Sequence, residues 1–191
     1  MDRSKARGEA VAATLAAVRR IEAEQGVTRE ALKAIRAELL ALAAQGELFP
    51  AEDFPGPEDG KGDRLYTLSL DDDRRFALYL NRGSADKDTP PHNHTTWAVI
   101  VGIAGEEHNT IYRRPSGAGT APMEIAAELT VKPGSGVCLL PDDIHSIHMR
   151  GSDPKLHLHL YGKAISEMTE RVKYDLATGE SAFFAPHPDA R

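Results

Sequence analysis

The sequence predicts a mainly β protein with helices at its N-terminus, and three observations support this fold class. Apolar residues recur at steps of three and four over the first fifty residues, as they do along one face of a helix. From Leu65 onward the period changes to two, in short segments that glycine, proline and aspartate separate. No helical pattern lies between these segments, so an antiparallel sandwich or barrel is favoured over an α/β fold.

Two amphipathic helices account for the N-terminal pattern. Their apolar positions are Val11, Leu15, Val18 and Ile21 in the first helix, and Leu32, Ile35, Leu39 and Leu42 in the second. Gly26 is expected to end the first helix, Thr28 to cap the second, and Gly46 to end it. We expect residues 1–48 to form a helical cover, followed by a loop rich in proline and glycine.

Short segments with alternating or wholly apolar residues carry the strand signal. They are residues 76–80, 97–101, 125–131, 137–140 and 155–161. The polar stretch 106–109 is interpreted as a loop, and residues 174–179 as a hairpin turn. Residues 64–180 are therefore expected to form one β barrel, and the chain 1–191 a single domain.

Composition limits the classes of function. The chain has 41% hydrophobic and 27% charged residues, and its net charge is −6 because 29 acidic residues outnumber 23 basic ones. No stretch is basic enough to follow a phosphate backbone, so nucleic acid is not expected as a partner. No apolar run approaches the roughly 18 residues of a membrane span. One cysteine and an N-terminus without the apolar core of a signal peptide predict a reducing, cytoplasmic setting.

Histidines are concentrated in one part of the chain, where seven of the eight lie between positions 92 and 159. Residues two apart in a strand point to the same side, so His92 and His94 can bind one ion. A third ligand is expected from residues 140–148, where His145 follows a turn and His148 has the opposite strand parity. We favour His145. Three neutral imidazoles suit iron, zinc, copper or nickel, so the ligands alone do not name the metal.

A third histidine cluster occupies the segment 156–161. Strict alternation places His157, His159 and Tyr161 on one face and three leucines on the other. A face of two imidazoles and a phenol is costly to bury without partners, so we expect it to line a pocket beside the metal. Of the remaining histidines, His108 and His187 are expected to be solvated, and His148 to support the metal ligands from outside or to be structural.

Four motifs mark the histidine-rich part of the chain: residues 91–94, 141–145 and 159–162, and the turn 174–179. Together they resemble the cysteine dioxygenase type I family, the thiol dioxygenases of the cupin superfamily. Many cupins place a glutamate ligand four or five residues after the second histidine, but here those positions are Ala98 and Val99. The missing carboxylate is typical of the all-histidine thiol dioxygenases. The resemblance implies a cupin barrel, which is a double-stranded β-helix or jelly roll.

The resemblance also implies an active site and a reaction. Mononuclear Fe(II) would be bound by His92, His94 and His145. His159 and Tyr161 would be outer-sphere groups close to substrate and oxygen. The substrates would be O₂ and a small thiol, either cysteine or a close analogue such as 3-mercaptopropionate, and the product would be the sulfinic acid. No 2-oxoglutarate, flavin or nicotinamide is required, and the chain has no glycine-rich dinucleotide loop.

Two further assignments follow from comparison with the family pattern. His157 stands where the family has a serine, and we include it among the candidate catalytic residues. The arginine that binds the substrate carboxylate lies upstream of the first metal ligand in the family. Arg64 is the nearest match here, and Arg82 is a competitor.

Two other classes of function remain open at this stage. A non-catalytic cupin could bind a metal or small ligand as a sensor. Another metal-dependent cupin enzyme, such as an isomerase or hydrolase, would need a carboxylate to activate metal-bound water. Asp142 and Asp143 are the nearest carboxylates to His145, and both have the pattern of turn residues.

Overall fold

The computed structural model describes residues 2–57, 62–83, 86–115, 121–151 and 153–185. Its helices are α1 (Arg3–Gln25) and α2 (Arg29–Ala43), with short 3-10 turns η1 (Gly46–Leu48), η2 (Ala51–Asp53) and η3 (Ile165–Glu167). Its strands are β1 (Asp63–Ser69), β2 (Arg75–Gly83), β3 (Lys87–Asp88), β4 (Ala98–Ala104), β5 (Glu107–Arg113), β6 (Glu124–Val131), β7 (Gly136–Leu139), β8 (Ile144–Met149), β9 (Lys155–Lys163), β10 (Val172–Tyr174) and β11 (Ser181–Phe183).

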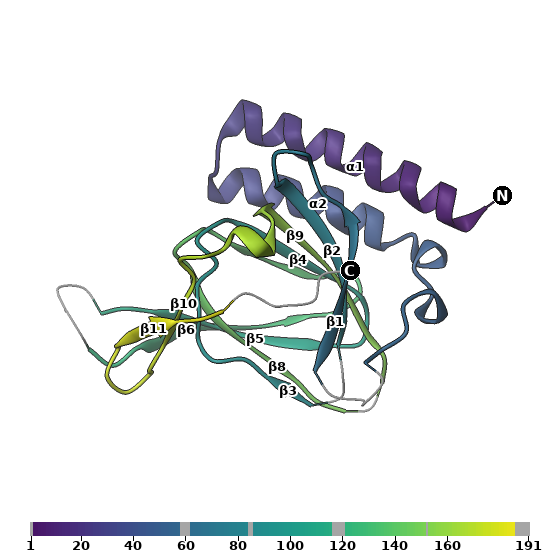
Figure 1. The fold of residues 1–191 in the computed structure, drawn as a ribbon. Coiled ribbons are helices and arrows are strands. Elements are labelled where there is room, and N and C mark those ends of the chain that lie inside the picture. Colours follow the sequence, from purple (N-terminus) through teal and green to yellow (C-terminus); the bar gives the residue numbers. More distant parts are fainter. Residues whose placement is uncertain (1, 58–61, 84–85, 116–120, 152, 186–191) are drawn as a thin grey trace.

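Two antiparallel sheets form the barrel (Figure 1). The strand order is β1-β2-β9-β4-β7 in the first sheet and β3-β8-β5-β6 in the second. If strands β2 to β9 are renumbered 1 to 8, the first sheet has the order 1-8-3-6 and the second sheet has the order 2-7-4-5. This order is that of a jelly roll, or double-stranded β-helix. The predicted fold class, a mainly β barrel with N-terminal helices, is confirmed.

The two helices cover the outer face of the first sheet (Figure 1). Apolar side chains of α1 and α2 pack against alternate residues of β2, β4 and β9 in one buried cluster. Leu156, Leu158 and Leu160 of β9 belong to this cluster, as their alternation predicts. The indole Nε1 of Trp97 donates a hydrogen bond to Oε1 of Glu22 in α1 (2.8 Å), which joins the barrel to its helical cover.

Local capping explains most of the helix boundaries. Thr28 accepts a hydrogen bond from a backbone N–H of α2 through its side chain, as expected for an N-cap. Gly26 follows α1 with a φ of 66°, which glycine adopts without strain. The prediction that Gly46 ends the second helix is wrong. The N–H of Gln45 donates to the carbonyl of Leu42 (3.1 Å), so the helix closes without a glycine, and Gly46 begins η1.

The interpretation of residues 106–109 as a loop is also wrong. Strand β5 begins at Glu107 and pairs with both β6 and β8. Glu107 and Asn109 are buried, whereas His108 between them is exposed, as expected. Polar residues on the buried face hide the alternation that normally marks a strand. The hairpin at 174–179 is confirmed, because this turn joins β10 to β11.

None of the described helices combines the length and the apolar character that a bilayer-spanning helix needs.

Close approach of two strands makes Gly102 of β4 sensitive to substitution. A Cβ at this position would lie 2.4 Å from the backbone carbonyl carbon of Lys132. Because backbone atoms cannot move aside cheaply, we expect Gly102→Ala to lower the free energy of unfolding by about 1–3 kcal/mol. Gly8→Ala, at a helical position with nothing within 4 Å of the added carbon, should raise it by about 0.5–1 kcal/mol. Urea denaturation followed by circular dichroism measures both, and an unchanged midpoint for Gly102→Ala would contradict the close approach.

Candidate metal centre and its cavity

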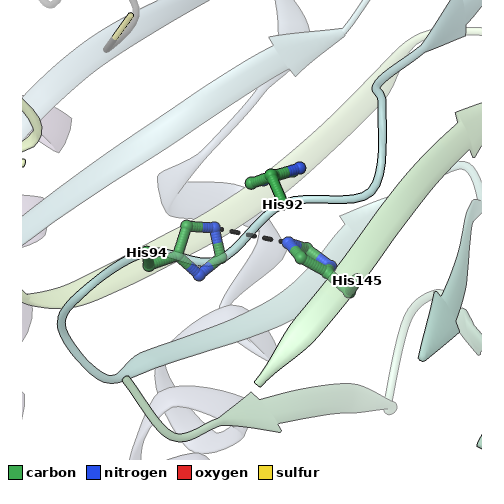
Figure 2. A group of neighbouring side chains, drawn as sticks. All are labelled: His92, His94 and His145. Carbon is green, nitrogen blue, oxygen red and sulfur yellow. Dashed lines mark hydrogen bonds between the residues drawn. The ribbon is translucent and has the colours of Figure 1, made fainter. Parts of the chain in front are cut away.

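Three buried histidines converge inside the barrel. His92 and His94 lie between β3 and β4, and His145 lies in β8. One ligand nitrogen from each lies within 4.8 Å of the other two. Figure 2 shows the rings gathered around one point, with Nε2 of His94 3.3 Å from Nε2 of His145. The structure therefore brings together the three residues that the sequence predicts as metal ligands.

Backbone contacts fix the positions of these histidines. The N–H of His92 donates to the carbonyl of His145 (2.8 Å), and the N–H of His145 donates back to the carbonyl of His92 (3.0 Å). This antiparallel bridge and a second one from His92 to Lys173 replace the regular strand that we expected at His92 and His94. After His94 the chain turns sharply at Thr95, whose φ of 57° is strained for a β-branched residue.

The outer ring nitrogens of two ligands are anchored. Nδ1 of His92 lies 2.8 Å from the carbonyl oxygen of Pro90, and Nδ1 of His145 lies 2.8 Å from Oδ1 of Asn109. Both partners are acceptors, so each Nδ1 carries the proton and each Nε2 keeps a lone pair. Such outer partners are typical of histidines that bind metals.

Burial keeps the three imidazoles neutral, which is the form that coordinates a metal. Loss of hydration lowers the pKa of His145 to about 3 and holds the pKa values of His92 and His94 well below their usual range. Two ligands on one ion, with metal–nitrogen bonds of about 2.1 Å, lie about 3.0–3.4 Å apart. The separation of 3.3 Å between His94 and His145 agrees with this, and the donor set fits a divalent transition metal.

Strand β9 supplies the polar groups beside the triad. The ring of Tyr161 packs edge-on against that of His94, with 5.4 Å between centroids. Nδ1 of His159 lies 3.1 Å from the phenolic oxygen of Tyr161. Burial raises the pKa of Tyr161 and lowers the pKa of His159 to about 4. The phenol therefore stays protonated and the imidazole stays neutral.

His157 shares this face of β9 but does not line the cavity. It is fully buried beside Glu107 of β5. Burial lowers the pKa of His157 to about 4, and the backbone of Gly105 opposes part of this shift. The expectation that all three polar residues of the strand face one pocket thus holds for His159 and Tyr161 only.

A cavity of about 320 Å³ lies beside the triad. Its walls include His92, His94, His159 and Tyr161, together with Arg171 and Phe184.

Arg171 is the cavity residue that sequence analysis missed. Its guanidinium carbon lies 4.3 Å from the ring centroid of Phe184, and its Nε has no hydrogen-bond partner among the described residues. Burial lowers its pKa, but a guanidinium remains charged. Residues 167–175 carry no periodic pattern, so their sequence contains no signal that this arginine turns inward.

The structure does not bring the two predicted substrate arginines to this cavity. Arg64 of β1 pairs in register with Arg82 of β2. Their chain neighbours Asp63, Leu65 and Asn81 line the cavity, whereas neither arginine is among the described lining residues. Adjacent residues of a strand point to opposite faces, so both arginines lie on the face that carries the helices.

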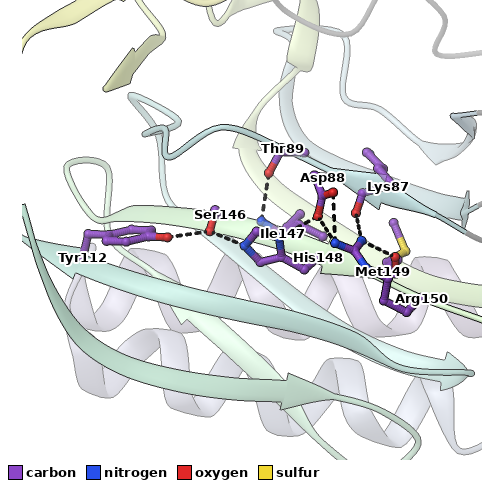
Figure 3. A network of polar contacts seen from close by, with 9 residues as sticks. All are labelled: Lys87, Asp88, Thr89, Tyr112, Ser146, Ile147, His148, Met149 and Arg150. Carbon is purple, nitrogen blue, oxygen red and sulfur yellow. Dashed lines mark hydrogen bonds and ion pairs between the residues drawn. The ribbon is translucent and has the colours of Figure 1, made fainter. Parts of the chain in front are cut away.

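His148 belongs to a separate polar network on β8. Its Nδ1 lies 2.7 Å from Oδ1 of Asp88, and its Nε2 lies 2.9 Å from Oγ of Ser146. Figure 3 shows this network extending to Tyr112 at one end and to Arg150 at the other. The opposite parity of His145 and His148 thus separates the triad from this network.

His187, the remaining histidine outside the barrel motifs, lies outside the described residues.

Comparison with known proteins identifies no family. No protein-family model and no curated protein matches the chain. One similar solved structure is hydroquinone 1,2-dioxygenase PnpCD in complex with Cd²⁺ and 4-hydroxybenzonitrile, with 15% identity over 55% of this chain and 66% of that chain (TM-score 0.39). Oxalate decarboxylase from Bacillus subtilis has 15% identity over 48% of this chain and 22% of that chain (TM-score 0.38). A cupin superfamily protein from Desulfitobacterium hafniense DCB-2 has 12% identity over 63% and 88% (TM-score 0.43).

The chain spans less than two thirds of the length of the first two structures. At this distance the similarities assign no activity, and the proposals below depend on the geometry of the site.

Removal of His145 tests the triad. We expect His145→Ala to weaken the binding of a divalent transition metal by roughly a hundredfold or more, because loss of a group that merely orients a ligand already costs about 10- to 100-fold. His148→Ala is the matched control on the same strand and should bind as the unaltered protein does. Anaerobic titration calorimetry measures both affinities. The reverse result would place the third ligand at His148.

Proposed function

We propose that this protein is an Fe(II)-dependent dioxygenase that converts a small carboxylate-bearing thiol to its sulfinic acid. One observation carries the proposal: a single cavity joins neutral histidines of the triad to a phenol and a buried guanidinium. The motif resemblance to the thiol dioxygenases supports the same chemistry. Cysteine and 3-mercaptopropionate are the substrates that we expect.

The triad sets the charge of the proposed iron site. His92, His94 and His145 would hold the ion, and because all three are neutral, its full +2 charge would favour an anionic thiolate in the cavity. In the part of the chain that the structure describes, no carboxylate joins this group. Fe(II) held there would supply the redox chemistry through which a thiolate reacts with O₂.

Arg171 would bind the substrate carboxylate. A guanidinium binds a carboxylate through two parallel hydrogen bonds, and that of Arg171 also contacts the ring of Phe184. Lys87, a second cation of the cavity wall, already forms an ion pair with Asp63. The thiol end of a substrate anchored at Arg171 would lie within the same small cavity as His92 and His94.

Tyr161 supplies a proton donor at the cavity wall. Since its phenol is neutral, it can donate a hydrogen bond to the substrate or to oxygen. This requires that Nδ1 of His159 carries a proton and donates to the phenolic oxygen, which the 3.1 Å separation permits. His159 thus orients the phenol, and Tyr161 makes the contact with the reactants.

The proposed reaction balances without an organic cofactor. A thiolate and O₂ yield a sulfinate: the O–O bond breaks, both oxygen atoms bond to sulfur, and sulfur supplies the four electrons.

Oxygen consumption tests the reaction directly. Protein loaded anaerobically with Fe(II) is expected to consume one O₂ for each cysteine or 3-mercaptopropionate oxidised, measured with an oxygen electrode and by mass spectrometry of the sulfinate. Zinc-loaded protein is the control, because zinc has no redox chemistry. If the iron-loaded protein consumes no O₂ with either thiol, the proposal fails and a sensor or a non-redox enzyme becomes the better interpretation.

Substitution of Arg171 tests how the substrate is bound. We expect Arg171→Gln to raise KM for 3-mercaptopropionate by about 10- to 100-fold, because a charge-assisted hydrogen bond contributes about 1.5–3 kcal/mol. Activity with cysteamine, which has no carboxylate, should not fall. Arg64→Gln is the matched control on the opposite face of the sheet and should leave KM unchanged. Equal KM values for Arg171→Gln and the unaltered protein would show that another group binds the carboxylate.

A further inference from the structure

A second group of ligand-type side chains is buried in the barrel beside the triad. Glu107 of β5 and His157 and His159 of β9 each offer one ligand atom, and these atoms lie within 4.8 Å of one another. The exposed fractions of the three residues are 0%, 0% and 3%. Two imidazoles and a carboxylate form a ligand set that holds divalent transition metals.

Several buried atoms of this group have no hydrogen-bond partner among the described residues. They are Oε2 of Glu107, Nε2 of His159 and the ring nitrogens of His157, one of which lies close to the backbone of Gly105 without meeting hydrogen-bond geometry. Oε2 of Glu107 lies 3.8 Å from Nδ1 of His157 and 3.8 Å from Nε2 of His159, which is too long for hydrogen bonds. Unpaired buried polar atoms are costly and rare. Their convergence on one point indicates a partner that is not a protein atom.

The other polar atoms of Glu107 and His159 are fixed from outside the group. Oε1 of Glu107 accepts a hydrogen bond from Nδ2 of Asn109 (2.9 Å). Nδ1 of His159 lies 3.1 Å from the phenolic oxygen of Tyr161. Each side chain therefore uses one atom for orientation and directs the other towards the shared centre, as metal-binding residues do.

No lysine or arginine among the described residues forms an ion pair with Glu107, whose neighbours at 3.8 Å are His157 and His159. The nearby Lys155 donates instead to the carbonyls of Gly151 (2.7 Å) and Asp153 (3.2 Å). Lys87 is paired with Asp63. No lysine or arginine is therefore paired with this buried carboxylate, and a metal ion would be the cation of the group.

We propose that Glu107, His157 and His159 form a second metal site, which binds a divalent ion such as zinc. Zinc takes nitrogen and oxygen ligands together, and water commonly completes its coordination. The ion would bind the atoms that otherwise have no partner. Its role is positional, because in the proposed reaction Tyr161, and none of these three residues, makes the contact with the substrate.

Asn109 links this second site to the triad. Its Oδ1 accepts from Nδ1 of His145 (2.8 Å), and its Nδ2 donates to Glu107. An ion bound at Nε2 of His159 also keeps the proton of that ring on Nδ1, where it faces Tyr161. The second ion thus orients groups of the first site from two directions.

Metal counting tests the inference. Metal-free protein without an affinity tag is titrated with zinc, and bound metal is measured by equilibrium dialysis and plasma mass spectrometry. The unaltered protein is expected to bind two equivalents per chain and Glu107→Gln only one. Glu128→Gln, which changes an exposed glutamate of β6, is the matched control and should bind two.

A second pair of variants distinguishes the two sites. His145→Ala should retain one equivalent, and the combination of His145→Ala with Glu107→Gln should retain none. His157→Gln should lose the same equivalent as Glu107→Gln, and circular dichroism compares the folds of all variants. One equivalent in the unaltered protein at saturating zinc would overturn the inference, as would two equivalents in Glu107→Gln and His157→Gln. Thiol oxidation is not measured, so the outcome is independent of the proposed function.

Discussion

The burial of imidazoles in the barrel interior is the constraint on which the rest of the site depends. Five imidazoles are buried there: His92, His94, His145, His157 and His159. Burial penalises the charged form of each ring, so all five are held neutral. A neutral imidazole needs an acceptor for its N–H and a donor or a cation for its lone pair. At several rings a backbone or side-chain acceptor binds the N–H. The two proposed metal ions would bind the lone pairs.

The jelly-roll topology brings these groups together from both sheets. The triad depends on the backbone bridge between His92 and His145, which ties the segment before β4 to a strand of the second sheet. His159 comes from the first sheet and Glu107 from the second, so their contact crosses the barrel. The helices take no part in this chemistry. They cover the outer face of the first sheet, where the leucines of β9 would otherwise meet water.

The spacing of residues within short segments predicted the features that depend on neighbouring residues alone. Helical periodicity marked α1 and α2, and the spacing and parity of His92, His94 and His145 marked the triad. Glu107 was missed because its strand has polar residues on the buried face, which periodicity interprets as a loop. The positions of Arg64 and Arg171 depend on strand register and on the path of the chain after η3. Both are long-range properties of the fold, and no short stretch of sequence encodes them.

The contact between Trp97 and Glu22 gives the protein an intrinsic optical probe. Trp97 is the only tryptophan of the chain, it is buried, and its indole N–H is bonded to α1. Its emission therefore comes from the boundary between the helical cover and the barrel and from no other place. A shift of that emission to longer wavelength reports entry of water at this boundary, so undocking of the helices can be followed separately from unfolding of the strands.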